Sequence, residues 1–174
     1  RDPIELLASD VDAVFVCTPN HMIPELTIQC LERGKHVFSE KPPGRTLNDI
    51  WKFSDQEIEN THDFIQIIFP LNKPSQSVSH GHYLHNEEEI NKIKQNENIQ
   101  KNIIKSSLWF LSFLKRNHQW KNRYDHNQLR ITRIIKSLRL LVSDNEADRF
   151  YKSILELLGN AKVNNTTLEF WKNA

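Results

Sequence analysis

Hydrophobic and polar residues follow two different patterns along the chain, and the first consists of short, continuous apolar runs. Residues 12–17 form such a run, which is typical of a strand covered on both faces. A turn sequence follows, and the apolar spacing then predicts a helix from about His21 to Arg33, closed by Gly34 in a left-handed conformation. Residues 35–39 begin a second short strand. This order of elements predicts a βαβ unit with a right-handed crossover.

From Ser54 onward, the apolar residues recur with helical spacing. Ser54 and Glu57 form a Ser-x-x-Glu capping box, so a helix is predicted to begin there and to continue until Pro70. Further helices are predicted over residues 98–115, 127–142 and 144–158, with shorter ones after Asn86 and from about Thr166. We expect the helix over residues 98–115 at the centre. The expected fold class is mainly α, with a five- to six-helix domain preceded by a partial βαβ fragment.

The overall composition excludes several classes of protein. The balance of 23 basic against 22 acidic residues gives no general field that attracts nucleic acid or an anionic membrane. No apolar run approaches the roughly 20 residues of a transmembrane helix. Cys17 and Cys30 fit thiols in a reducing compartment better than a disulfide. We therefore expect a soluble, cytoplasmic protein without a nucleic-acid partner, whose oligomeric state the composition leaves open.

Two segments near the N-terminus carry a more specific signal. They read Val-Asp-Ala-Val-Phe-Val-Cys-Thr-Pro-Asn-His over residues 11–21 and Gly-Lys-His-Val-Phe-Ser-Glu-Lys-Pro over residues 34–42. Both closely resemble the Gfo/Idh/MocA oxidoreductases, an NAD(P)-dependent family with a Rossmann-type domain. The resemblance implies cofactor-binding positions and one catalytic lysine. The implied cofactor-binding residues are Thr18, Pro19, Asn20, Glu40 and Pro42, and the implied catalytic residue is Lys41.

Other parts of such an enzyme have no counterpart in the chain. The sequence has only four glycines and no G-x-G-x-x-G motif, so a phosphate-binding loop is missing. No second, substrate-binding domain is recognisable downstream. We therefore expect Lys41 to be vestigial and the chain to be a truncated, inactive oxidoreductase at most, with no bound cofactor, or NAD(P) if the resemblance is functional. In a purely structural interpretation, Asn20 forms a turn and Lys41 is a solvated charge.

Five short segments in the rest of the chain carry a second resemblance. They cover residues 44–50, 61–66, 69–71, 126–134 and 167–171. In this order they resemble the conserved region of the opioid growth factor receptor family. The resemblance implies an all-α, non-enzymatic binding module for a peptide or protein ligand, and allows a location at the nuclear envelope.

The two resemblances place a domain boundary between residues 43 and 44. Residues 1–43 would be a partial dinucleotide-binding fragment, and residues 44–174 the receptor-like domain. The charges differ accordingly, because residues 1–43 hold four basic and seven acidic residues, whereas the remainder holds 19 and 15. We expect a gene fusion near Pro43 to Leu47, or an artificial joining of two neighbouring genes.

Several polar and aromatic residues of the second part are candidates for contact with a ligand. Arg130, Arg133, Lys136 and Arg139 recur every three residues, and they bind an anionic partner or simply form a solvated helix face. Trp109 belongs to the core or lines a peptide groove. The predicted ligand-binding residues are His62, Arg130, Arg133 and Trp109.

The histidines give no sequence pattern that is typical of a metal site or a catalytic pair. His80, His82 and His85 have no accompanying cysteine and match no standard zinc spacing, so no metal is expected. His62 has an acidic neighbour in sequence and so has His126, but adjacent helical residues point in different directions. We expect His62 to pack against the helix after residue 126 or to cap a loop.

Overall fold

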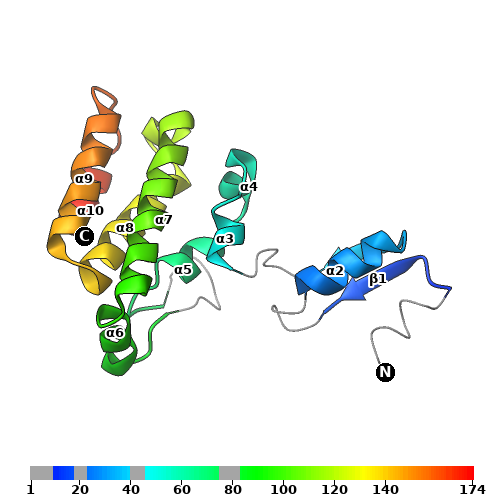
Figure 1. Ribbon diagram of the computed structural model, residues 1–174. Coiled ribbons are helices and arrows are strands. Elements are labelled where there is room, and N and C mark those ends of the chain that lie inside the picture. Colours follow the sequence, from blue (N-terminus) through cyan, green and yellow to red (C-terminus); the bar gives the residue numbers. More distant parts are fainter. Residues whose placement is uncertain (1–9, 18–22, 40–45, 75–82) are drawn as a thin grey trace. The chain divides into compact units, whose positions relative to one another are not determined.

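The computed structural model describes residues 10–17, 23–39, 46–74 and 83–174. The chain forms two compact units, residues 1–52 and 53–174 (Figure 1). The boundary expected between residues 43 and 44 stays a prediction, because residues 40–45 lie outside the described part. Among the described helices, none is long and apolar enough to cross a membrane.

Two short parallel strands and a helix form most of the first unit. Strand β1 (Ala13–Val16) pairs with strand β2 (His36–Ser39), with Ala13 opposite His36 and Val16 opposite Ser39. Helix α2 (Ile23–Glu32) lies between them in the chain and contacts both strands. The predicted βαβ unit is therefore confirmed.

The core of this unit lies between the sheet and α2. Val14, Val16 and Cys30 are buried there. Phe15 is 71% exposed, so the expectation that β1 is covered on both faces is wrong. Successive side chains of a strand point to opposite faces, and α2 covers only the face that carries Val14 and Val16.

The end of α2 has the conformation that the sequence predicts. Gly34 has a φ of 69°, in the left-handed region that glycine enters without a steric cost. The amide of Lys35 then donates to the carbonyl of Cys30 at 3.0 Å. Helix α3 (Leu47–Ile50), which the sequence analysis did not predict, begins with a capping box between Thr46 and Asp49.

All regular secondary structure in the described residues of the second unit is helical. It contains α4 (Asp55–Asn60), α5 (Phe64–Ile68), α6 (Glu87–Lys94), α7 (Glu97–Arg116), the 3-10 turn η1 (Gln119–Lys121), α8 (His126–Leu141), α9 (Asp144–Leu158) and α10 (Asn165–Lys172). The fold class expected from the sequence, mainly α behind a partial βαβ fragment, is confirmed.

The capping box at Ser54 forms, but the helix that it begins is shorter than expected. Glu57 accepts from the amide of Ser54 at 2.7 Å, and Ser54 accepts from the amide of Glu57. Instead of continuing to Pro70, the helix ends at Asn60, and α5 follows after a break. At the break Thr61 has an extended backbone, and the side chain of Arg130 binds its carbonyl oxygen. A distant side chain thus replaces a helical hydrogen bond.

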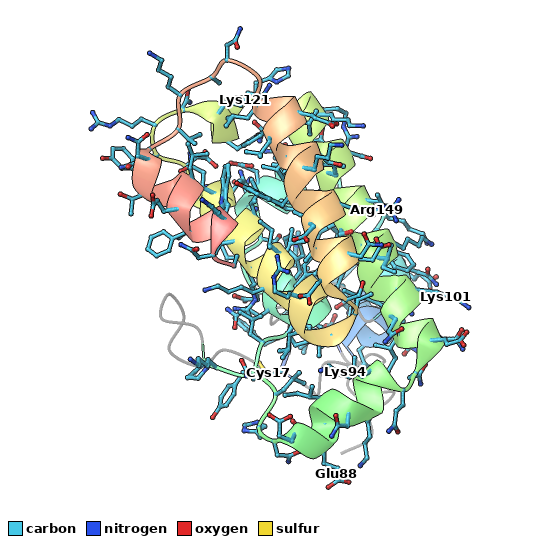
Figure 2. The ribbon with its side chains drawn as sticks, turned by 90° about the vertical axis from the view of Figure 1, so that its left-hand side faces the viewer. Cys17, Glu88, Lys94, Lys101, Lys121 and Arg149 are labelled. Carbon is cyan, nitrogen blue, oxygen red and sulfur yellow. The ribbon has the colours of Figure 1, made fainter. Side chains whose placement is uncertain are left out.

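Helix α8, rather than α7, occupies the centre of this unit. It contacts α6, α7, α9, α10 and η1 (Figure 1). Its residues Ile131, Ile134 and Ile135 are fully buried. Helix α9 runs along α7 and α8, with Arg149 on its outer surface and Lys101 on that of α7 (Figure 2). The core therefore forms around the apolar face of α8.

Two buried tryptophans connect the end of this core to α8. The rings of Trp120 and Trp171 lie 6.3 Å apart, and both side chains are fully buried. The indole of Trp171 donates to the carbonyl of Gln128 at 3.1 Å, and that of Trp120 to the carbonyl of Leu114 at 2.9 Å. Each indole N–H is satisfied, as burial of a tryptophan requires.

Candidate functional site

The first candidate site lies at the carboxyl ends of the two parallel strands. Val16 and Ser39 are paired, so the chain leaves both strands at the same edge of the sheet. Open α/β folds bind ligands beyond this edge. The residues that follow are those predicted to bind the cofactor or to act in catalysis: Thr18, Pro19, Asn20, Glu40, Lys41 and Pro42. All six lie outside the described residues, and their roles stay predictions.

Arg130 is placed in the interior of the helical unit. It is 5% exposed, and its guanidinium donates to the carbonyls of Ile58 and Thr61 at 2.9 and 2.8 Å and to Asn127 Oδ1 at 2.9 Å. Burial lowers the pKa of Arg130 to about 10, against the opposing effect of the nearby carboxylates of Glu59 and Asp125. These contacts stabilise the break between α4 and α5, and the ligand role of Arg130 stays a prediction.

His62 and Trp109 lie near the same break. His62 is exposed, its Nδ1 lies 3.1 Å from the carbonyl oxygen of Asn60, and its ring lies 5.5 Å from that of His126. It therefore both caps a loop and packs against α8, as expected. Trp109 is half-buried and meets the ring of Phe64 edge-on at 5.8 Å, so its described contacts are with the core.

Arg133 lines a cavity of about 730 Å³ that we call the basic pocket. Its Nε donates to the carbonyl of Phe69 at 2.9 Å, whereas its Nη2 is buried and has no hydrogen-bond partner among the described residues. Burial lowers the pKa of Arg133. The pocket is lined by Leu71, Asn72, Lys73, Pro74, Lys94, Arg133, Lys136, Arg139, Leu140, Asn173 and Ala174. Its described lining holds five cationic side chains and no aspartate or glutamate, but Arg139 is already paired with Asp144 and Asp148 outside the pocket.

The cations of the basic pocket come from segments that the sequence does not connect. Lys73 precedes α6, Lys94 ends α6, and Arg133, Lys136 and Arg139 lie on α8. Sequence reasoning found the three α8 residues through their spacing, but no local pattern relates Lys73 or Lys94 to them.

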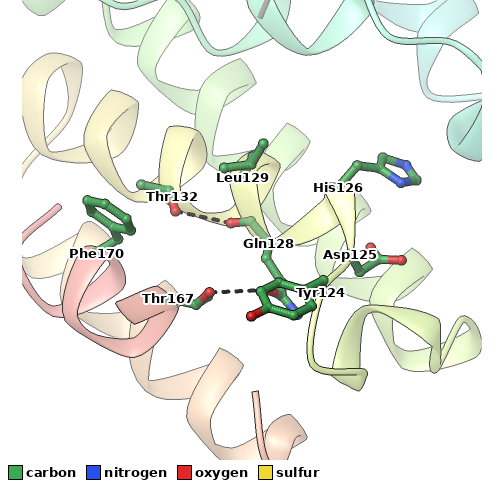
Figure 3. A pocket seen from close by; sticks show the side chains of 8 residues that line it. All are labelled: Tyr124, Asp125, His126, Gln128, Leu129, Thr132, Thr167 and Phe170. Carbon is green, nitrogen blue, oxygen red and sulfur yellow. Dashed lines mark hydrogen bonds between the residues drawn. The ribbon is translucent and has the colours of Figure 1, made fainter. Parts of the chain in front are cut away.

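A second, more apolar cavity of about 430 Å³ lies between α8 and α10 (Figure 3). Its rim includes Tyr124, Leu129 and Phe170, which are 69%, 64% and 58% exposed. Gln128 lies at its base, where Oε1 accepts from Thr167 Oγ1 at 3.2 Å. Leu129 and Phe170 therefore lie on the exposed sides of α8 and α10.

Comparison with known proteins concerns the N-terminal part of the chain. Residues 1–69 match the family model described as oxidoreductase family, NAD-binding Rossmann fold. Myo-inositol 2-dehydrogenase of Thermotoga maritima is 41% identical over 70 residues, covering 40% of this chain and 20% of that protein. A glycosyl hydrolase family 109 protein of Porphyromonas gingivalis is 31% identical over 97 residues, covering 47% and 20%. 1,5-Anhydro-D-fructose reductase of Ensifer adhaerens is 50% identical over 40 residues, covering 23% and 12%.

The chain thus spans about a fifth or less of the length of these curated relatives. No solved structure matches it. Of the two resemblances seen in the sequence, the comparisons support the one to NAD(P)-dependent oxidoreductases, and the expectation that no cofactor is bound is not confirmed. They give no support to the receptor resemblance, and the match to residue 69 includes two of the segments that carry it.

Proposed function

We propose that the N-terminal part of this chain binds a nicotinamide dinucleotide as part of an NAD(P)-dependent oxidoreductase. The observation that carries the proposal is the family match over residues 1–69, which includes the parallel βαβ unit. The pairing of Val16 with Ser39 supports it, because the two candidate segments leave the sheet at one edge. A cofactor lying across this edge could be reached from both.

Each candidate residue then has a defined role. The turn of Thr18, Pro19 and Asn20 would lie against the cofactor, with Glu40 and Pro42 flanking Lys41. A bound nicotinamide supplies or accepts a hydride at a substrate carbon. Lys41 would hold the proton that the substrate oxygen gains or loses. Since two of the relatives are named for myo-inositol and an anhydrofructose, we propose a polyol or sugar as the substrate class.

Titration of the whole chain with NADH and NADPH, followed by nicotinamide fluorescence and calorimetry, tests cofactor binding. Because the sequence has no G-x-G-x-x-G motif, we expect weak but saturable binding, with a Kd on the order of 0.1 to 1 mM. Asn20→Ala should weaken it severalfold, whereas the control Lys52→Ala, at an exposed position of the same unit, should leave it unchanged. Absence of saturation with both cofactors up to about 10 mM would refute the proposal.

For the helical unit, we propose a second function as a binding module for an acidic peptide at the basic pocket. The specific observation is the buried, unpartnered Nη2 of Arg133. A desolvated guanidinium N–H lacks a hydrogen bond that water would otherwise provide, and a ligand carboxylate would restore it with a charge-assisted bond once the guanidinium turns toward the cavity. Lys73, Lys94 and Lys136 add positive charge around the same cavity.

Calorimetry with a short peptide rich in Asp and Glu, and with its Asn and Gln counterpart, tests this second function. We expect the acidic peptide to bind and Arg133→Gln to weaken it about tenfold. Arg149→Gln is the matched control, because Arg149 is an exposed arginine of α9 outside the pocket. Equal affinity for both peptides, or equal effects of the two substitutions, would contradict the proposal.

A further inference from the structure

We propose that Glu59, Asp125 and His126 form a binding site for a divalent transition-metal cation, with His62 as a fourth ligand. One candidate ligand atom from each of the three residues lies within 4.8 Å of the other two. They come from α4, from the residue before α8 and from the first residue of α8. In the described part of the chain, these are the histidine and acidic side chains that lie close enough together for three of them to share one ion.

The imidazole of His126 is directed at the carboxylate of Glu59. Its Nε2 lies 3.4 Å from Glu59 Oε1, is shielded from solvent and has no hydrogen-bond partner in the described part of the chain. Two ligands of one zinc ion at about 2.0 to 2.1 Å lie roughly 3.3 Å apart in tetrahedral geometry. The nitrogen and the oxygen are therefore already separated by a distance that suits a shared ion.

Neighbouring amides orient both carboxylates. Glu59 Oε2 accepts from Asn117 Nδ2 at 2.9 Å and from Asn127 Nδ2 at 3.1 Å, while Oε1 lies 3.4 Å from both Asn127 Nδ2 and His126 Nε2. Asp125 Oδ1 accepts from the amide of Asn127 at 2.8 Å and so caps α8. Hydrogen bonds of this kind fix the orientation of a ligating carboxylate. Figure 3 shows Asp125 and His126 on the same side of the start of α8.

His62 offers a second imidazole, whose side chain must move to join the other three, because its ring nitrogens are not part of the group that lies within 4.8 Å. Its Nδ1 lies 3.1 Å from the carbonyl oxygen of Asn60, which accepts a hydrogen bond from Nδ1–H in the neutral ring. Nε2 then carries the lone pair, and this is the tautomer that binds a metal through Nε2. The ring lies 5.5 Å from that of His126, centroid to centroid.

The charge of the cluster favours a cation. Two carboxylates lie near the guanidinium of Arg130, whose hydrogen bonds go to the carbonyls of Ile58 and Thr61 and to Asn127 Oδ1. A divalent ion would reverse the remaining negative charge. Two imidazoles and two carboxylates suit Zn²⁺, Co²⁺ or Ni²⁺ better than Mg²⁺ or Ca²⁺, which prefer oxygen ligands.

Titration of the whole chain with ZnCl₂ by calorimetry, and with CoCl₂ by visible absorption, tests the site under reducing conditions. We expect one ion per chain and a cobalt spectrum without a thiolate charge-transfer band, which excludes Cys17 and Cys30 as ligands. Glu59→Gln and His126→Gln should each weaken binding at least about tenfold, and His62→Gln by a smaller factor. His118→Gln, at an exposed histidine before η1, is the matched control and should bind like the unchanged protein.

Thermal unfolding of each variant without metal shows whether it still folds. A folded His126→Gln variant with undiminished affinity would overturn the site, as would absence of saturable binding up to about 1 mM Zn²⁺. Unchanged affinity of His62→Gln would remove His62 from the ligand set and contradict the four-ligand proposal. Weaker binding by site variants that still fold, together with unchanged binding by the His118→Gln control, supports the metal site.

Discussion

Arg130 donates to the backbone carbonyl of Thr61 at 2.8 Å, across the break that separates α4 from α5. A second nitrogen of the same guanidinium binds the carbonyl of Ile58 at 2.9 Å. A buried side chain of α8 therefore satisfies carbonyls at the end of a short helix that is distant in sequence. The position of α4 against α8 depends on this connection, and so does the approach of Glu59 to His126.

Replacement of Arg130 by Lys should destabilise the helical unit markedly. A lysine ammonium cannot reproduce the two nitrogens of the planar guanidinium that bind separate carbonyls, so at least one buried carbonyl loses its donor. We therefore expect the free energy of unfolding to fall by about 2 to 4 kcal/mol. Urea denaturation followed by circular dichroism measures it. Arg149→Lys, at an exposed salt bridge, should change the value by less than about 0.5 kcal/mol. Equal unfolding midpoints for the two variants would show that the buried hydrogen bonds of the Arg130 guanidinium do not contribute to stability.

Trp171 should contribute far more to stability than its neighbour Phe170. Trp171 is fully buried and donates to the carbonyl of Gln128, whereas Phe170 is 58% exposed. We expect Trp171→Ala to cost about 3 to 5 kcal/mol, and Phe170→Ala less than about 1 kcal/mol. Chemical denaturation of both variants gives the comparison. If Phe170→Ala cost as much as Trp171→Ala, the exposed position of Phe170 would be wrong.

The ion pair between Asp55 and Arg116 should make stability depend on pH in the acidic range. The hydrogen bond from Arg116, at 2.6 Å, lowers the pKa of Asp55 in the folded protein. The stabilisation is therefore complete above the unfolded pKa of about 3.9, and is lost as the pH falls through the lower folded pKa. Both side chains are substantially exposed, so we expect a contribution below about 1 kcal/mol.

Unfolding of Asp55→Asn in urea at pH 7 and near pH 3 measures this dependence. The variant should be less stable than the unchanged protein at pH 7, and the difference should shrink at the lower pH. Lys101→Met, which breaks an exposed pair within α7, controls for a general change of charge. A difference that grew as the pH fell would have the opposite sign to the one expected.

The two cysteines should react at different rates in the folded protein. Cys17 is exposed at the end of β1, whereas Cys30 is buried against Val14 and Val16. A thiol reagent such as DTNB should therefore label one thiol rapidly in buffer and both in urea. Cys17→Ser should remove the rapid phase and leave the slow one. Rapid labelling of Cys30 in that variant would mean that the βαβ core does not form in solution.

The sequence by itself determined the features that depend on residues a few positions apart. Ser54 with Glu57, Asn86 with the first turn of α6, and Gly34 at the end of α2 all behave as their positions in sequence predict. Capping bonds and left-handed glycines are local, so three or four residues contain all the chemistry they require. The same holds for the βαβ unit and for the mainly helical class, which follow from the period of the apolar residues.

The tertiary structure decided which distant residues meet. The break after Asn60 depends on Arg130, and the metal cluster depends on Glu59 reaching the first turn of α8. The basic pocket likewise gathers Lys73 and Lys94 beside Arg133, although no sequence spacing relates them. Exposure also belongs to this level, because the apolar period does not say whether another element covers Phe15, which is exposed. Such contacts arise from the packing of whole elements, whose relative positions no local pattern specifies.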